Sequence, residues 1–400
     1  MTNFKNTKKA FFIPQNTIYL DGNSLGPLPL TAARRLNIVT EKEWGELLIR
    51  GWNEAGWMKF PTENGNRIAK IINAGVGNVV VGDTLTIKVF QALDAAIQIS
   101  TKRTKGSRNI ILSDIANFPS DLYIAKTLQE RAGFKLKLVE PFNVEKSLST
   151  DVAILLLSHV DYRTGQLHDM QKISRLAKNF EIVTVWDLAH SVGVVEINLL
   201  ETPVDFAVGC TYKYLCGGPG APAFIYVNPE IQEDVQPAIP GWLGHMKPFD
   251  FNENYIPGKG IERMRIGTPP VLQMAVLEEA LKIWEKVNIS DVRKKSIELT
   301  EYFISEMSDL APKLRLASPK DALLRGSQVS FFSNNGYPII QALISEGIIG
   351  DFREPNIIRF GFNPLFNTKS DIKKAAKNLS RIISSKAWKK TLFSIRRQVT

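Results

Sequence analysis

The residue of this sequence that is best placed for chemistry is a lysine that follows an apolar run. In DFAVGCTYKYLCGGPG, Lys213 comes shortly after the strand-like residues 205–210, and glycines follow at 217, 218 and 220. Because these glycines permit backbone conformations that a side chain would forbid, the loop can approach a ligand closely. A lone lysine after a strand is more often a surface residue, so its interpretation depends on its neighbours.

A carboxylate ends the preceding apolar run EIVTVW, and LAH follows it, so that Asp187 and His190 lie close together in sequence. A carboxylate at the end of a buried strand is costly unless a cation pairs with it. A pyridinium nitrogen is such a cation, and a carboxylate that keeps it protonated makes the ring an electron sink. Asp187 would equally suit a helix N-cap. Its combination with Tyr212 and Lys213 favours the pyridine cofactor.

Two further loops carry groups that would suit a phosphorylated ring. In GDTLTIKVFQAL a helix opens directly after a strand, where backbone N–H groups and the Thr86 hydroxyl could hold a phosphate. Thr84 or Thr86 as plain N-caps is the alternative. In ANFPSDLYIAK, Phe118 could stack on a pyridine ring. Ser120 and Asp121 could cap the next helix, hydrogen-bond the cofactor, or do both.

The elements that would position these loops are short apolar runs that alternate with helical patterns between Asn78 and Val227. Helices are expected over 85–99, 121–131 and 170–179. This alternation predicts a mainly parallel sheet covered on both faces. Ligands of such sheets bind beyond the C-terminal ends of the strands, where all the loops named above lie. The seven strand-like runs are NVVVGD, NIILSD, FKLKLVE, DVAILLLSHV, EIVTVWD, DFAVGC and APAFIYV.

The pattern changes near residue 270. Two long helical runs, at 271–287 and 290–310, are followed by short strand-like pieces and a basic helix over 370–383. This mixture predicts a smaller α+β domain. We therefore expect an N-terminal segment at 1–50 that packs with the small domain, a large domain at 51–265 and the small domain at 266–400.

Composition excludes several classes of protein. The 400 residues are 44% hydrophobic and 22% charged, as in a globular enzyme of two domains. The net charge of +10 is scattered, apart from a modest concentration in the tail at 386–397, which we expect to form a closing surface helix. A nucleic-acid binder would gather its excess charge in one stripe. We therefore expect neither a nucleic-acid nor a membrane partner.

The compartment follows from cysteine usage and from the N-terminus. Cys210 and Cys216 form no disulfide framework and no metal-ligand spacing, so no metal is expected. The first fifteen residues carry too short an apolar patch for a secretory signal, and the richest apolar run, 152–157, is too short to span a bilayer. A cytoplasmic protein is the expectation.

Taken in their order and spacing, the motifs of this chain resemble those of the kynureninases, which are pyridoxal-phosphate enzymes of fold type I. The resemblance covers most of the chain. The matching stretches are YLDGNSLGPLP, WNEAGW, Leu85-Thr86, FPSD, YRTGQLHDM, WDLAHSVG, YKYLCGGPG, GWLGH, GTPP and RFGFNPLF.

The resemblance implies a role for each matching residue. Lys213 would form the Schiff base with pyridoxal 5'-phosphate, Asp187 would pair with the ring nitrogen, and Arg359 would hold the substrate's α-carboxylate. A bidentate guanidinium–carboxylate pair suits that task. Thr268 stands where some relatives have Asn. The remaining cofactor-binding residues would be Leu85 and Thr86 at the phosphate, Phe118 on the ring, Pro119 and Ser120 after it, Asp121 near the ring hydroxyl, Ser158 and His190 beside the cofactor, and Tyr212, Trp242 and Thr268 on the phosphate side.

The resemblance also implies the reaction, which is hydrolysis of L-kynurenine or 3-hydroxy-L-kynurenine to L-alanine and an anthranilate. Lys213 would move the Cα proton, Tyr212 would be a proton donor or acceptor in later steps, and His190 would be a bystander beside the ring. A homodimer whose active sites borrow residues from the partner is expected by analogy. The kynurenine pathway of tryptophan breakdown, or NAD biosynthesis, is the implied context.

Three alternatives remain beside this interpretation. A cysteine desulfurase needs a catalytic cysteine in a late loop, and no cysteine follows Cys216. An aminotransferase-like enzyme of the same fold is not excluded by inspection. A basic, non-enzymatic anion-binding protein would bind no cofactor and would associate in a strongly salt-dependent way.

Overall fold

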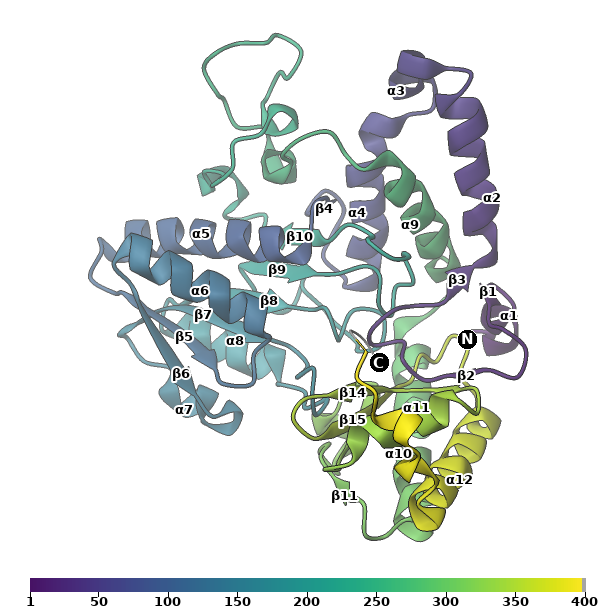
Figure 1. Cartoon of the computed structure of the whole chain (residues 1–400). Coiled ribbons are helices and arrows are strands. Elements are labelled where there is room, and N and C mark those ends of the chain that lie inside the picture. The colour runs from purple at the N-terminus through teal and green to yellow at the C-terminus, as the bar shows by residue number, and fades with distance from the viewer. Residues whose placement is uncertain (398–400) are drawn as a thin grey trace.

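A seven-stranded sheet forms the centre of the larger part of the molecule (Figure 1). The computed structural model describes residues 1–397. Five neighbouring strands are parallel to one another, and β10 runs antiparallel to both of its neighbours. The predicted, mainly parallel seven-stranded sheet is therefore confirmed. In spatial order the strands are β4 (Val79–Val81), β10 (Phe224–Val227), β9 (Phe206–Gly209), β8 (Val183–Asp187), β7 (Val152–Ser158), β5 (Ile110–Asp114) and β6 (Lys135–Val139).

The central strands β7 and β8 are buried along their whole length because helices cover both faces of the sheet. In β7, Ile154 and Leu156 pack toward α5 (Leu85–Thr104) and α6 (Pro119–Ala132). Their neighbours Leu155 and Leu157 pack on the opposite face, with α8 (Met170–Asn179), α4 (Phe60–Ile71) and α9 (Val271–Trp284). The alternation of side chains along a strand thus feeds two separate cores.

A second, antiparallel sheet lies in the C-terminal part of the chain. Its strands follow the spatial order β11 (Arg315–Leu316), β12 (Gln328–Phe332), β15 (Ile357–Gly361) and β14 (Asp351–Arg353). The helices α10 (Ile289–Leu310), α11 (Gly336–Ile344) and α12 (Lys369–Ser385) accompany it. A capping box at the start of α12, in which Thr368 and Asp371 bond each other's backbone, satisfies two N–H groups of the first turn. The smaller α+β part is as predicted, whereas the domain limits at 50 and 265 stay predictions.

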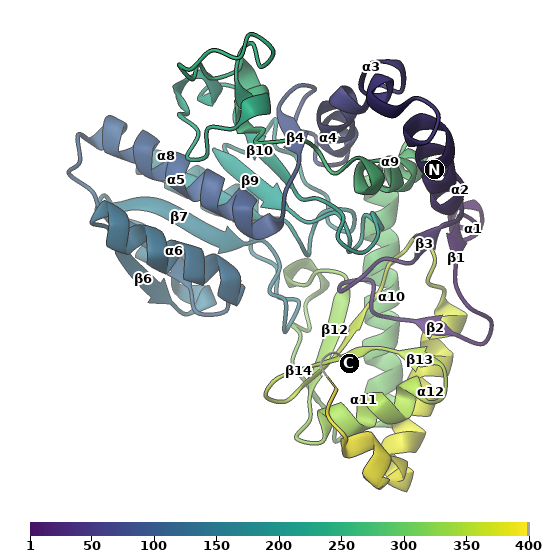
Figure 2. The same ribbon diagram turned by 45° about the horizontal axis from the view of Figure 1, so that its top comes forward.

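The N-terminal residues connect the two parts of the molecule, with β2 (Ile18–Tyr19) beside the smaller sheet and α2 (Leu30–Ile38) beside the larger part (Figure 2). The strand β2 pairs with β13 (Ile348–Ile349), and Asp21 forms a β-bridge with Gly361. The N-terminal helix α2 runs beside α9 of the larger part. The remaining short elements are α1 (Phe4–Lys8), β1 (Phe11–Phe12), β3 (Leu28–Pro29), α3 (Gly51–Glu54) and α7 (Val144–Ser147).

The tail corrects one expectation, because it does not continue as a helix. Lys386 adopts a left-handed conformation (φ 57°) that ends α12, and two short 3₁₀ turns follow. Phe393 is buried in the C-terminal core, and Tyr337 Oη donates to the Ile395 carbonyl at 2.9 Å. Packing of Phe393 therefore outweighs the helical pattern. Among residues 1–397, no helix combines the length and apolar character that a membrane crossing requires.

Candidate active site

The site begins at the C-terminal ends of β7 and β8. Ser158 and Asp187 are the last residues of these strands and are direct neighbours in the sheet. Asp187 is 4% exposed, and its carboxylate accepts from the Ala189 N–H at 2.9 Å and from Ser158 Oγ at 3.5 Å. Burial raises the pKa of Asp187, while the charge of Lys213 and these hydrogen bonds oppose that rise. The Asp187 carboxylate therefore has no ion-pair partner within residues 1–397, and a cationic ring nitrogen could supply one.

The loop after β9 carries Lys213, whose charge opposes the rise in the pKa of Asp187. Its Nζ lies 2.9 Å from His190 Nε2, 5.9 Å from the ring centre of Phe118 and 5.7 Å from that of Tyr212. Burial, and next the charge of Lys213, hold the pKa of His190 well below its usual value, so the imidazole is neutral. Lys213 is 9% exposed, and among residues 1–397 it has no carboxylate at ion-pair distance. The hydrogen bond to His190 therefore orients the amine, and no carboxylate forms an ion pair with it within these residues.

The loop before α6 supplies an aromatic face and a second carboxyl group. Phe118 remains 37% exposed, and its ring meets Tyr162 edge-on at 5.0 Å. Asp121 is fully buried in the first turn of α6, and one of its oxygens has no hydrogen-bond partner within the described residues. Burial raises the pKa of Asp121 well above its usual value, and the charge of Asp187 adds to that rise. Ser120 Oγ bonds Asp121 at 3.3 Å, and no side chain caps α6, so the capping interpretation of both residues is wrong.

The start of α5 lies against the loop that carries Lys213. The Gly82 N–H donates to the Ala223 carbonyl at 2.8 Å, and the Ala223 N–H donates to the Asp83 carbonyl at 2.9 Å. Thr84 occupies the N-cap position of α5, yet its side chain makes no capping hydrogen bond. No capping side chain therefore uses the first-turn N–H groups at Leu85 and Thr86, and these groups can donate hydrogen bonds to an anion.

Arg359 lies on β15, opposite Asp351 on β14. It is 2% exposed, and its Nε donates to Asp351 Oδ1 at 2.8 Å. Its other groups donate to Ser24 Oγ at 2.9 Å and to the Tyr162 carbonyl. Burial and the charge of Lys213 are the larger causes of the low pKa of His190, and the charge of Arg359 contributes to it as well.

Two of the predicted residues, Trp242 and Thr268, make no hydrogen bond or ring contact with this cluster within residues 1–397. Trp242 and Thr268 lie on the long segment between β10 and α9, which extends beyond α5 at the top of Figure 1. Trp242 is 46% exposed and packs on Phe249 and Phe251, at ring distances of 5.5 and 6.2 Å. Thr268 is also exposed.

Several residues of the site escaped the sequence analysis. Asn117 accepts from Ser158 Oγ at 2.6 Å and donates to Ser113 Oγ at 3.0 Å, so it ties the Phe118 loop to β7. Its place directly before FPSD was the only available signal. Asp351 and Ser24 bond Arg359. Asp351 could have been predicted only from the pairing of β14 with β15, and local sequence carries no signal for that pairing.

The residues present fit pyridoxal phosphate. The fit rests on one oxygen of Asp121 and Nδ1 of His190, which have no hydrogen-bond partner within residues 1–397, on the buried carboxylate of Asp187, and on the Lys213 amine beside His190. A phosphorylated pyridine with a ring hydroxyl and an aldehyde supplies the complementary groups. Phe118 offers an open ring face beside them.

Comparison with solved structures defines the class of fold. A cysteine desulfurase from Thermococcus onnurineus NA1 matches with a TM-score of 0.79 and 17% identity, over 95% of this chain and 98% of that one. A C-DES mutant with glycine covalently linked to its PLP cofactor matches with a TM-score of 0.78 and 17% identity, over 92% and 97%. The fold is that of the fold-type-I pyridoxal-phosphate enzymes, and at this identity the likeness reaches no further.

The sequence relatives define the family. The family model of the kynureninase C-terminal domain matches residues 292–379. Kynureninase of Pseudomonas fluorescens is 42% identical over 398 residues, which is 98% of this chain and 95% of the relative. Kynureninase of Burkholderia pseudomallei (strain K96243) is 40% identical over the same shares. This chain belongs to the kynureninase family, as the sequence motifs predicted.

Proposed function

We propose that this protein hydrolyses the Cβ–Cγ bond of L-kynurenine, 3-hydroxy-L-kynurenine or both, and releases L-alanine and the corresponding anthranilate. The observation that carries the proposal is the Lys213 amine, which lies 2.9 Å from a neutral His190 and whose charge acts on the buried Asp187, in a chain related to kynureninases over 98% of its length. The cofactor is pyridoxal 5'-phosphate, which when bound through Lys213 supplies an electron sink for negative charge at the substrate's Cα.

Residues of this chain would hold the cofactor from three sides. Asp187 would keep the ring nitrogen protonated, since a buried carboxylate gains most from a cationic partner. Phe118 would cover a ring face, and Pro119, Ser120 and Asp121 would lie on the side of the ring hydroxyl. The phosphate would meet the first turn of α5 at Leu85 and Thr86, together with the Tyr212 hydroxyl.

Two side chains would handle protons. Lys213 Nζ would take the proton from the substrate's Cα, and the hydrogen bond to His190 Nε2 would orient the amine for that transfer. Burial raises the pKa of the Tyr212 phenol, and Cys210 adds to the rise, so the hydroxyl is protonated at neutral pH. Tyr212 is therefore suited to donate a proton to a departing carbon.

The test of the proposed reaction is a product analysis. Incubation of the holoenzyme with each kynurenine should give anthranilate or 3-hydroxyanthranilate and L-alanine in equal amounts. An aminotransferase of the same fold would instead form a keto acid and need an acceptor. Formation of keto acid without any anthranilate would overturn the proposal, and the ratio of kcat/KM for the two kynurenines would decide the preferred substrate.

Arg359→Lys should raise KM for the substrate by about 10- to 100-fold, because a compact ammonium cannot reproduce the directed N–H groups of a planar guanidinium. The effect on kcat should be much smaller, since the carboxylate does not react. Steady-state kinetics would measure both constants, with the exposed Arg381→Lys as the matched control. A fall in kcat at unchanged KM would contradict the role of Arg359 in binding the substrate carboxylate.

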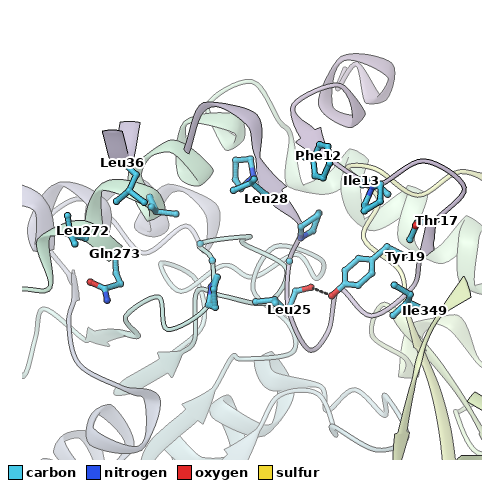
Figure 3. Close-up of a pocket in the computed structure, with 18 residues that line it drawn as sticks. Phe12, Ile13, Thr17, Tyr19, Leu25, Leu28, Leu36, Leu272, Gln273 and Ile349 are labelled. Carbon is cyan, nitrogen blue, oxygen red and sulfur yellow. Dashed lines mark hydrogen bonds between the residues drawn. The ribbon is translucent and has the colours of Figure 1, made fainter. Parts of the chain in front are cut away.

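We further propose that the enzyme is a homodimer whose partner completes each active site. Trp242 and Thr268 resemble phosphate-side residues of the family, yet both side chains are exposed in the single chain. The N-terminal part exposes several large apolar side chains, among them Phe12, Leu30 and Trp44. An apolar cavity of about 670 Å³ lies beside it, between Leu28, Leu36 and Leu272 (Figure 3). Exposed apolar surface of this kind suits a second copy of the chain.

Mixing two inactive variants should test this arrangement. If Trp242 serves the partner's site, Lys213→Ala and Trp242→Ala chains that are unfolded and refolded together should regain up to about a quarter of wild-type activity, because each mixed dimer holds one intact site. Each variant refolded alone is the control. No gain after mixing, with mixed dimers demonstrated by tags, would contradict the proposal.

A cytoplasmic setting is also proposed. Cys210 and Cys216 are both free and buried, which fits a reducing compartment. Fractionation of cells that produce the protein would test the location, and recovery outside the cytoplasm would contradict it. The kynurenine pathway is the setting that the proposed substrate implies.

A further inference from the structure

Arg359 does not stand free for a substrate, because the chain already surrounds it with its own acceptors. Four of its five N–H groups are used: Nε and Nη2 donate to Asp351, Nη2 also donates to Ser24 Oγ, and Nη1 donates to the Tyr162 carbonyl. A second cation, Arg353, lies 2.9 Å from the same Asp351 carboxylate and is partly exposed. The proposed carboxylate site is therefore a pair of arginines that shares one internal carboxylate.

A second internal carboxylate closes the group from the N-terminal segment. Asp21 forms a β-bridge with Gly361, two residues beyond Arg359. The two ends of the Asn23 amide lie 3.2 Å from Asp21 Oδ1 and 3.0 Å from Arg359 Nε, so this amide connects the carboxylate to the guanidinium. Two arginines and two aspartates thus share one partly buried space.

The net charge of these four side chains determines how strongly they attract the carboxylate of a substrate. With both aspartates ionised the two pairs cancel, and an added carboxylate would leave one uncompensated negative charge in a site of low dielectric. With one aspartate protonated the group carries a single positive charge. A bound carboxylate neutralises that charge.

Asp21 is the aspartate that becomes protonated. Burial and then the charge of Asp351 raise the pKa of Asp21 to about 7, although Arg359, Ser24 and Arg353 oppose the rise. Burial also acts on Asp351, but the charges of Arg359 and Arg353 and the hydrogen bonds outweigh it and hold the pKa of Asp351 below its usual value.

The other groups that face Asp21 do not compete for the proton. Tyr19 on its own segment and Tyr214 from the loop after β9 both have pKa values raised by burial, and the charge of Asp21 adds to each rise. Both phenols are therefore neutral near pH 7. Asp351 and Arg353 of β14 and Arg359 of β15 keep their charges.

We propose that binding of the substrate's carboxylate at the Arg353–Arg359 pair is coupled to uptake of one proton from solvent by Asp21. The substrate remains a carboxylate, and the proton adds to an oxygen of Asp21, so Asp21 acts as a positioning residue that does not touch the reacting atoms. This inference rests on the proposed function, because it takes Arg359 as the carboxylate site.

The probe for the test is 3-benzoylpropionate, which keeps the carboxylate and the aryl ketone of kynurenine but lacks both amino groups. Calorimetry on the holoenzyme in two buffers of different ionisation enthalpy measures the protons taken up. We expect nearly one proton at about pH 8 and a Kd that increases by about tenfold per pH unit above about pH 7. The sign follows because only the protonated form of Asp21 leaves a positive charge for the anion.

Asp21→Asn should abolish proton uptake and keep the low-pH affinity at all pH values, whereas Asp21→Glu should restore a pH dependence. Asp309→Asn, an exposed carboxylate on α10, is the matched control and should behave as wild type. Arg353→Gln, which leaves Asp21 in place, should move the bend in the Kd profile to higher pH because one opposing charge is lost.

The results separate this inference from the proposed reaction. Proton uptake that persists in Asp21→Asn, a wild-type Kd that does not change with pH, or a bend that Arg353→Gln leaves unmoved would each overturn it. Absence of any binding would overturn the carboxylate site and the inference with it. Proton-coupled binding without kynurenine turnover would instead refute only the proposed reaction.

Discussion

Replacing Lys213 with alanine is expected to abolish turnover of kynurenine, with a loss of at least about 10³-fold, because both the covalent anchor and the proton-transferring group disappear. The visible absorbance of the lysine-linked cofactor should be lost as well. Lys213 Nζ contacts only His190 among the polar side chains at hydrogen-bond distance in residues 1–397, so its removal should cost little folding stability.

The exposed Lys126→Ala on α6 is the matched control for this experiment and should keep full activity and absorbance. Thermal unfolding of both variants would separate a loss of chemistry from a loss of fold. If Lys213→Ala retained turnover at the wild-type rate, Lys213 would not be the residue that anchors the cofactor and transfers the proton. A small primary amine added to the variant should restore part of the activity, since it can replace the missing proton acceptor.

Asp187→Asn is expected to lower kcat by about 10²- to 10³-fold while the cofactor remains bound. An amide keeps the size of the carboxylate and can still accept from the Ala189 N–H, which the carboxylate accepts at 2.9 Å. It carries no negative charge, however, and so cannot hold a cofactor nitrogen in its protonated form. The rate should therefore fall through loss of the electron sink and not through loss of the fold.

Asp205→Asn provides a control with a similar carboxylate at the opposite end of the sheet. Burial raises the pKa of Asp205 too, and its carboxylate accepts from the Thr184 N–H at 2.9 Å. Its replacement should affect the melting temperature and leave kcat per folded molecule unchanged. If Asp187→Asn behaved in the same way as this control, the carboxylate would have a structural role only.

Local patterns were sufficient for the large sheet and for the core of the site. Fully buried strands read as continuous apolar runs, and their carboxyl ends meet at one edge. For this reason Asp187 and Lys213, which follow separate runs, could be expected to face each other, and the structure places Lys213 within reach of His190 and beside Phe118. The individual roles of these residues remain predictions until the variants are measured.

The surroundings of Arg359 could not be predicted from local patterns. Asp21 and Ser24 come from the N-terminal segment, Tyr162 from the loop after β7, and Asp351 from a neighbouring short strand. Their pairing depends on strand register and on how the two parts of the chain meet. The tail failed as a helix for a related reason, because burial of Phe393 outweighed its local pattern.

The sequence by itself determined the class of fold, the family and the residues at the ends of the large sheet, because strand periodicity and loop motifs are local properties of the chain. Only the tertiary structure decided that Arg359 shares its charge with Asp351 and lies near Asp21. It also decided that Trp242 is exposed and packs on Phe249 and Phe251. The physical reason is that charge balance and burial depend on neighbours in space, and residues more than 300 positions apart become neighbours only when the chain folds.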